Sequence, residues 1–171
     1  VESKTQAAGE KIGAARFAAY GKTVSPDATF TLRLSYGTVR GYPFNGTLAP
    51  PKTPLYGLFG RGADFDGRSP FELAPRWRAA EKALDLATPI DFVCTTDIIG
   101  GNSGSPVVNR AGELVGLVFD GNIESLVGDY IYDEATNRTV AVHSAGMTEA
   151  LLKVYGAEAL VEELLGANRG G

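Results

Sequence analysis

The sequence predicts a mostly β fold with flanking helices. Apolar and polar residues alternate over 28–36, and two apolar runs on either side of a polar turn over 107–119 predict a hairpin. Alanine-rich and amphipathic segments stand near the two ends of the chain, at 3–20 and 144–165. With 171 residues, 44% of them hydrophobic, the chain is long enough to form one domain with a core.

The first third of the chain predicts a helix, a turn and a strand. Residues 3–20 are rich in alanine with apolar residues among charged ones, which favours a helix that stops at Gly21. The turn at 25–27 leads into 28–36, the clearest strand pattern in the sequence. Residues 39–42 either continue this strand or pair back on it.

The middle of the chain is dominated by glycine and proline. Residues 43–75 show no sustained period, so we expect a long ordered loop, which either lines a site or is a surface excursion. Residues 76–86 have helical spacing, and we expect Trp77 to belong to the core. Residues 90–94 form a strand-like run that ends at Cys94, which favours a buried thiol.

The last third predicts short strands and a helical end. The strands are expected at 107–108, 113–119, 130–132 and 139–142. Residues 144–165 form one or two amphipathic helices, interrupted at Gly156. The tail over 168–171 is expected to fray.

Composition excludes several classes of function. Sixteen basic and twenty acidic residues give a net charge of −4, and no basic cluster is interleaved with aromatics, so we expect no nucleic-acid partner. No apolar run is long enough for a membrane span, and the first residues lack a secretion-signal pattern. One cysteine and one histidine cannot make an internal disulfide or the usual zinc cluster, and we expect no cofactor.

The stretch Gly101-Asn102-Ser103-Gly104-Ser105-Pro106 has the composition of a nucleophile turn. A catalytic serine needs an exposed hydroxyl and nearby backbone N–H groups for the charge that develops in acyl transfer, and glycine permits both. A plain polar loop between strands is the alternative. The run resembles the nucleophile signature of chymotrypsin-like peptidases. That resemblance implies Ser103 as the nucleophile and the N–H groups of Gly101 and Ser103 as the oxyanion hole.

The chain from residue 26 onward resembles the C-terminal part of the bacterial dipeptidyl-peptidase 7 and 11 family. The resemblance is carried by residues 27–37, 96–107, 112–117, 119–122 and 138–143. It implies the second β-barrel of a chymotrypsin-like double barrel. We accordingly expect the end of a helical region at 1–22, the C-terminal barrel at 23–143, and a C-terminal helix and tail at 144–171.

The resemblance also implies a substrate. Asp120 matches the family's aspartate that holds the free α-amino group of an oligopeptide, although a turn-forming aspartate is the alternative. Gly121 stands where members that prefer Asp or Glu before the cleaved bond carry arginine. An uncharged pocket there implies release of N-terminal dipeptides whose second residue is apolar or aromatic.

The base is missing from the chain. In the chymotrypsin order the histidine and aspartate precede the serine, and the single histidine, His143, follows Ser103 by forty positions. His143 as the base would need another chain order, so we expect it to be bonded locally or exposed. We therefore expect a fragment, inactive alone, whose His and Asp lie in an N-terminal half outside it.

Other functions stay open at this stage. The domain could be a non-catalytic peptide-binding or scaffolding module of peptidase descent. It could also be an endopeptidase of the glutamyl type, although the presence of Asp120 is evidence against that reading. The resemblance implies the periplasm or cell surface of a Gram-negative bacterium. The sequence leaves the oligomeric state open, a homodimer included.

Overall fold

The computed structural model describes residues 2–21, 32, 34–128 and 130–166. The chain divides into two compact units, residues 1–34 and 35–171. The first unit contains the expected N-terminal helix, α1 (Glu2–Tyr20), which ends where Gly21 takes a positive φ of 62°. No helix among the described residues is both long and apolar enough to cross a membrane.

The second unit is built on a five-stranded antiparallel sheet with the strand order β3-β4-β7-β6-β5. Its strands are β3 (Lys52–Pro54), β4 (Pro89–Cys94), β5 (Pro106–Val108), β6 (Leu114–Gly121) and β7 (Thr139–His143). The expected mostly β fold with flanking helices is thus confirmed. A closed barrel is not confirmed, because β3 and β5 are the two edges of this sheet in the described part of the chain.

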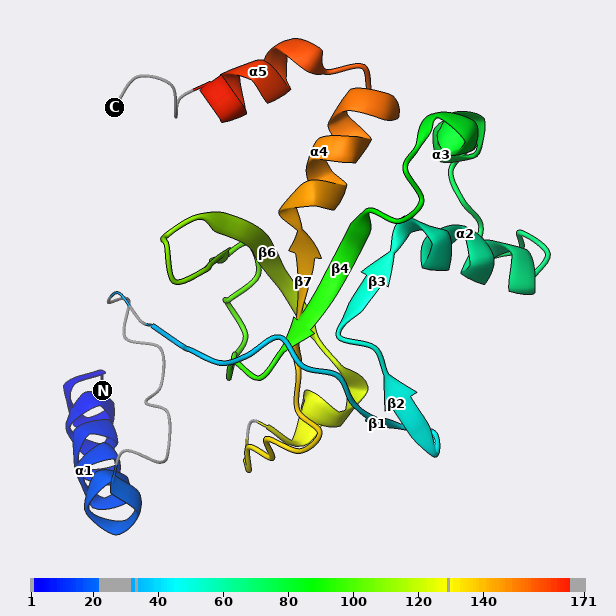
Figure 1. Cartoon of the computed structure of the whole chain (residues 1–171). Coiled ribbons are helices and arrows are strands. Elements are labelled where there is room, and N and C mark those ends of the chain that lie inside the picture. The colour runs from blue at the N-terminus through cyan, green and yellow to red at the C-terminus, as the bar shows by residue number, and fades with distance from the viewer. Residues whose placement is uncertain (1, 22–31, 33, 129, 167–171) are drawn as a thin grey trace. The chain divides into compact units, whose positions relative to one another are not determined.

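Helices gather at one end of the sheet (Figure 1). There α2 (Leu55–Asp64) follows β3, α3 (Pro75–Ala80) with the 3-10 turn η2 (Glu81–Ala83) precedes β4, and α4 (Ser144–Lys153) and α5 (Glu158–Gly166) follow β7. One core lies here, formed by Leu55, Phe59, Ala80, Leu84 and Val154, and Trp77 packs against it as expected. A second core on the sheet is formed by Phe92, Cys94 and Ala141, so the buried thiol is confirmed.

The hairpin of β5 and β6 is confirmed. Val107 pairs with Gly116, and the Asn109 side chain closes the turn by accepting hydrogen bonds from the N–H groups of Ala111 and Glu113 at 2.9 and 3.1 Å. Such a turn depends on neighbouring residues only, which is why the pattern predicts it well.

The expected long loop at 43–75 is wrong. It contains a two-stranded hairpin, β1 (Tyr42–Phe44) with β2 (Thr47–Ala49), then β3 and α2. Helix α2 contains three glycines and has no capping side chain, so its sequence lacks the usual signals of a helix. Tertiary contacts replace the cap, since the N–H groups of Leu55 and Tyr56 donate to the carbonyls of Thr88 and Leu86, both at 2.8 Å.

Two expected strands are also wrong where the structure describes them. Residues 32 and 34–36 are not in a strand, and the rest of 28–36 lies outside the described residues. The side chains of Leu32, Leu34 and Tyr36 are exposed, so no neighbour supplies the pairing that alternation alone suggested. Residues 130–132 are not in a strand either: the N–H groups of Tyr130 and Ile131 donate to the carbonyl of Val127 in a turn, and Tyr132 has no regular structure.

Candidate active site

The glycine-rich turn lies between β4 and β5, at the end of the sheet away from α4. Gly101 and Gly104 have backbone φ angles of 103° and 85°, values that residues with a Cβ rarely adopt. Asn102 ties the turn together, because its N–H donates to the Ile99 carbonyl at 3.1 Å and its Oδ1 accepts from the Ile99 N–H at 2.9 Å. The turn has a definite backbone geometry, as a nucleophile turn requires.

Backbone N–H groups in this turn alternate between bonded and free. The N–H of Asn102 is bonded within the turn, and that of Gly104 donates to the Val118 carbonyl of β6 at 2.7 Å. Between them, the N–H groups of Gly101 and Ser103 have no acceptor among the residues that the structure describes. A pair of unsatisfied N–H groups flanking one residue can stabilise an oxyanion.

Ser103 is exposed, and its hydroxyl has one partner within the described chain. Its Oγ donates to the backbone carbonyl of Phe119 at 3.3 Å. Phe119 lies where the pairing of β6 with β7 shifts register, between Val118 and Asp120. A backbone carbonyl cannot take up the hydroxyl proton, so this contact orients Ser103 without activating it.

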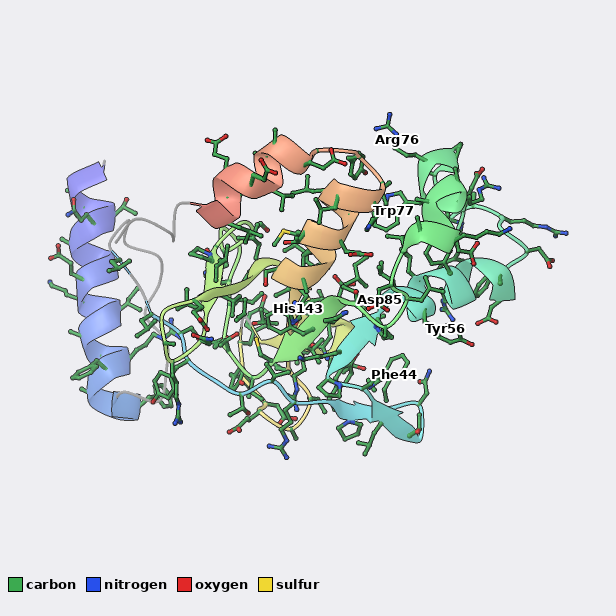
Figure 2. All side chains as sticks on the ribbon, turned by 45° about the horizontal axis from the view of Figure 1, so that its top comes forward. Phe44, Tyr56, Arg76, Trp77, Asp85 and His143 are labelled. Atoms are coloured by element: carbon green, nitrogen blue, oxygen red, sulfur yellow. The ribbon has the colours of Figure 1, made fainter. Side chains whose placement is uncertain are left out.

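His143 is the last residue of β7 and directly precedes α4, so it lies at the end of β7 away from the glycine-rich turn (Figure 2). Its Nδ1 accepts a hydrogen bond from the Ala145 N–H at 3.1 Å, so the imidazole caps the helix. His143 pairs with Gly116, three residues before Phe119 on β6, which is a separation of about 10 Å along the strand. The expected local bonding is confirmed, and His143 makes no hydrogen bond to Ser103.

His143 predicts how the stability of the fold changes with pH. Burial, and to a lesser extent the charge of Lys52, lower the pKa of His143 below its ordinary value of 6.5. The unfolded chain therefore binds this proton more readily, and the stability that the neutral cap contributes is present above pH 6.5 and declines as the pH falls below it. We expect His143→Asn, which keeps a capping acceptor, to lose less stability than the native protein between pH 7 and pH 5.

Thermal unfolding of both proteins across this pH range measures the difference. Equal pH slopes in the two proteins would show that His143 does not carry this dependence.

Asp120 and Gly121 follow Phe119 at the end of β6. The carboxylate of Asp120 is exposed, and its Oδ1 accepts from the Gly121 N–H at 2.8 Å. No other group of the described residues donates to it in a hydrogen bond or ion pair. A Cβ at Gly121 would meet the Ser125 side chain of η3 (Ile123–Val127), so the wall beside this strand end is already filled.

A buried polar network behind this strand end was not singled out from the sequence. The Arg138 guanidinium, with 2% of the residue exposed, donates to the carbonyls of Arg40, Gly41, Glu134, Ala135 and Asn137. Asn122, also buried, accepts from the Arg138 N–H at 2.8 Å and donates to the Thr136 carbonyl at 2.8 Å. One available signal was a charged residue directly before the apolar run of β7.

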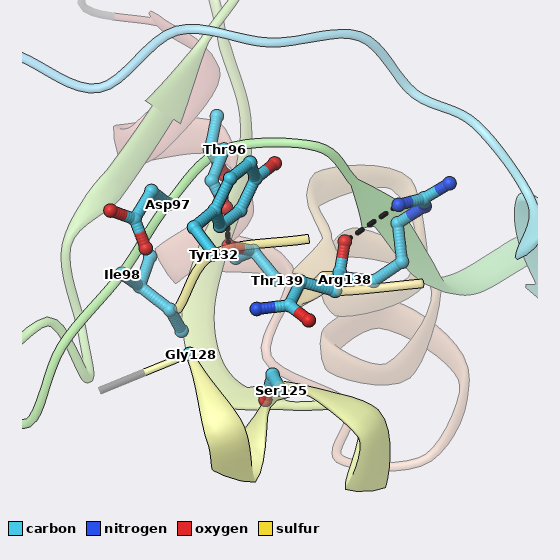
Figure 3. Close-up of a pocket in the computed structure, with 9 residues that line it drawn as sticks. Thr96, Asp97, Ile98, Ser125, Gly128, Tyr132, Arg138 and Thr139 are labelled. Carbon is cyan, nitrogen blue, oxygen red and sulfur yellow. Dashed lines mark hydrogen bonds between the residues drawn. The ribbon is translucent and has the colours of Figure 1, made fainter. Parts of the chain in front are cut away.

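A cavity of about 10 Å³ lies against this network (Figure 3). It is lined by Thr96, Asp97, Ile98, Ser125, Gly128, Tyr132, Asn137, Arg138 and Thr139. Burial raises the pKa of Tyr132, and the charges of Glu134 and Asp97 add to this, so its hydroxyl stays protonated and donates to the Thr95 carbonyl at 2.6 Å. In the described part of the chain no group of His, Cys, Asp or Glu is placed to hold a metal ion.

Bacterial dipeptidyl-peptidases are similar to this chain over most of its length. It is 37% identical over 150 residues to dipeptidyl-peptidase 7 of Phocaeicola vulgatus, covering 82% of the chain and 20% of that protein. It is 36% identical over 148 residues to an Asp/Glu-specific dipeptidyl-peptidase of Porphyromonas gingivalis, covering 81% and 20%. The chain thus spans about one fifth of the length of these relatives.

Solved structures agree with the sequence comparison. The crystal structure of Porphyromonas endodontalis DPP11 in complex with the dipeptide Arg-Glu matches with a TM-score of 0.75 at 30% identity, over 89% of this chain and 23% of that one. The model of the peptidase S46 family matches residues 1–166, which is nearly the whole chain. Together with the glycine-rich turn and the sheet that holds it, this match shows that the chain belongs to the peptidase S46 family.

Proposed function

We propose that this chain is the nucleophile-bearing part of a serine dipeptidyl-peptidase. Ser103 would attack the second peptide carbonyl of an oligopeptide, and the N–H groups of Gly101 and Ser103 would stabilise the oxyanion. The observation that carries the proposal is the pair of unsatisfied N–H groups beside an exposed serine hydroxyl.

The proton of Ser103 needs a base that the described residues do not supply. The hydroxyl bonds to a backbone carbonyl, and His143 is engaged as a helix cap. The base and its carboxylate partner therefore come from a part of the whole protein outside this chain, and the chain alone has negligible turnover.

Asp120 is suited to hold the substrate's free α-amino group. Its carboxylate is exposed, and Asp120 directly follows Phe119 in the sequence, the residue whose carbonyl accepts a hydrogen bond from Ser103. A charge-assisted hydrogen bond to an ammonium group at this place would favour peptides with a free N-terminus a short distance from the reacting carbonyl. Such an anchor explains dipeptide release in preference to internal cleavage.

Gly121 adds no charged side chain to this strand end. A side chain there would require Ser125 to move, so the present strand end accommodates glycine. The absence of a charged side chain at this position favours an apolar or aromatic second residue in the substrate. The relative from P. gingivalis is similar in sequence but is named as Asp/Glu-specific. The apolar or aromatic preference is therefore proposed for the present chain only. We further propose that the whole protein acts in the periplasm or at the cell surface.

The proposal is tested by assaying the complete protein, including its upstream sequence, on matched peptides with free and acetylated N-termini. We expect dipeptides to be released from the free peptides only. Cleavage of the acetylated peptides would instead indicate an endopeptidase, and binding without cleavage would indicate a non-catalytic module.

Replacement of Asp120 by asparagine tests the amino-group anchor. We expect kcat/KM on free peptides to fall by about 10- to 150-fold, because a hydrogen bond to a charged group contributes about 1.5–3 kcal/mol. The matched control is Asp66→Asn, which removes an exposed carboxylate from a remote turn at a positive φ that asparagine also accepts. Equal activity of both variants would contradict the role of Asp120.

A further inference from the structure

A second and larger cavity, of about 230 Å³, lies between α2 and α3. Both helices stand at the end of the sheet where the helices gather, whereas the glycine-rich turn lies at the other end (Figure 1). The described residues that line this cavity include none from that turn or from the strand end at Asp120. An apolar cavity of about 150 Å³ can hold a benzene molecule. The cavity between α2 and α3 therefore has room for a ring-sized side chain together with a polar head group.

The walls of this cavity are mainly apolar. Phe59 of α2 is buried in the helical core, and Gly62 and Ala63 of the same helix also line the cavity. Leu73, in the segment after α2, is half-buried and packs against the same core. A Cβ at Gly62 would lie 3.4 Å from the Leu73 Cγ, so the two walls meet there. Such walls favour an apolar group in the cavity.

The segment after α2 is fixed by its own contacts. The N–H of Gly67 donates to the Gly62 carbonyl at 2.8 Å. The ring centroids of Phe65 and Phe71 lie 4.1 Å apart, and the guanidinium carbon of Arg61 lies 4.7 and 4.8 Å from them. The cavity is therefore preformed, which reduces the entropy that a ligand would lose by ordering its walls.

Arg78 places hydrogen-bond donors at this cavity. Its guanidinium is exposed but held by two hydrogen bonds, from Nε to the Leu73 carbonyl at 3.0 Å and from Nη2 to Glu72 Oε1 at 3.1 Å. Its Nη1 has no acceptor among the described residues. A guanidinium that is held in one orientation and keeps free N–H groups binds a carboxylate through charge-assisted hydrogen bonds.

Glu81 places the opposite charge at the same cavity. It follows Arg78 by three residues, a spacing that brings two side chains onto one face of a helix. Arg78 forms its ion pair with Glu72 and not with Glu81. The exposed carboxylate of Glu81 takes part in no hydrogen bond or ion pair in the described part of the chain. A carboxylate in this position fits an ammonium group.

We propose that this cavity binds a zwitterionic amino acid with an apolar side chain, such as phenylalanine or leucine. The α-carboxylate of the ligand bonds Nη1 of Arg78, its α-ammonium group bonds Glu81, and its side chain packs against Phe59 and Leu73. A ligand with a charged side chain does not match the apolar walls, and an uncharged apolar ligand leaves both charges unused. The cavity shares no residue with the proposed active site, so the inference does not depend on Ser103.

The first test measures binding of L-phenylalanine to the complete protein by isothermal titration calorimetry. We expect a dissociation constant of about 1 mM, as is ordinary for a ligand of this size. N-acetyl-L-phenylalanine lacks the ammonium group and L-phenylalaninamide lacks the carboxylate, and each is expected to bind about 10-fold more weakly. No measurable binding of L-phenylalanine at millimolar concentrations, or equal binding of all three compounds, overturns the proposal.

The second test assigns each charge to its residue. Glu81→Gln is expected to weaken L-phenylalanine binding by about 10-fold and to leave binding of N-acetyl-L-phenylalanine unchanged. Arg78→Gln is expected to weaken L-phenylalanine binding similarly and to leave binding of L-phenylalaninamide unchanged. Lys82→Gln is the matched control, since Lys82 belongs to the same 3-10 turn as Glu81 and does not line the cavity.

Asp120→Asn separates this cavity from the proposed active site. Binding of L-phenylalanine is expected to persist in Asp120→Asn. Binding that is lost in Asp120→Asn and kept in Glu81→Gln would place the ligand at the strand end of β6 and overturn the proposal. Dipeptide release plays no part in these measurements, so a failure of the proposed function leaves the outcome for the cavity unaffected.

Discussion

Replacement of Ser103 by alanine is expected to lower kcat/KM for dipeptide release by the complete protein by about 10⁴- to 10⁶-fold. Removing a catalytic nucleophile costs this much because the remaining oxyanion hole and binding contacts retain only about 10³- to 10⁴-fold of the acceleration over water. The turn itself should survive, since the backbone hydrogen bonds of Asn102 and Gly104 do not involve the Ser103 side chain. Steady-state kinetics on a free peptide with an aromatic second residue measures the loss.

Ser105→Ala is the matched control for this variant. Ser105 stands in the same turn, and its carbonyl accepts from the Val118 N–H at 2.9 Å, a bond that alanine keeps. We expect Ser105→Ala to change kcat/KM by no more than a few-fold. A loss of less than about 100-fold for Ser103→Ala, or an equal loss in both variants, would contradict Ser103 as the nucleophile.

Replacement of Arg138 by methionine is expected to destabilise the fold by about 3–5 kcal/mol. Methionine fills the space but leaves the carbonyls of Arg40, Gly41, Glu134, Ala135 and Asn137 without this donor. Each buried acceptor that loses its partner costs about 1–3 kcal/mol, reduced where water can enter. This is a large part of the 5–15 kcal/mol that ordinarily separates folded from unfolded protein.

Denaturant unfolding of the two proteins measures this loss. Arg110→Met serves as the control, because Arg110 is exposed in the turn between β5 and β6, and its change is expected to stay within about 0.5 kcal/mol. A loss below 1 kcal/mol for Arg138→Met would mean that the five carbonyls find other partners. If Arg138→Met still folds but is less stable, its denaturant unfolding curve would have a lower midpoint than that of the native protein.

Locally determined elements were predictable from the sequence. The hairpin of β5 and β6, the strands β4 and β7 and the break between α4 and α5 at Gly156 follow patterns within a few residues. Elements that depend on distant partners were missed or misplaced. The first N–H groups of helix α2 donate to carbonyls some thirty residues away in the sequence. The alternating residues of 28–36 do not form a strand where the structure describes them.

The candidate site divides along the same line. Ser103, Gly101, Asp120 and Gly121 were identified because residue types and spacing in one short stretch, together with a family resemblance, point to them. Arg138 and Asn137 were not, since the guanidinium bonds the carbonyls of Arg40 and Gly41, 98 and 97 positions earlier in the chain. No local pattern records a partner at that separation.

The sequence by itself determined that a serine stands in a glycine-rich turn between two strands, because glycine and proline dictate backbone geometry without help from distant residues. The tertiary structure alone decided which N–H groups of that turn have no acceptor among the described residues, since β6 takes up one of them through Val118. It also decided that His143 caps a helix and that Asn137 Oδ1 has no hydrogen-bond partner in the described part of the chain. These outcomes depend on which donors and acceptors packing brings together, and packing is a property of the whole fold.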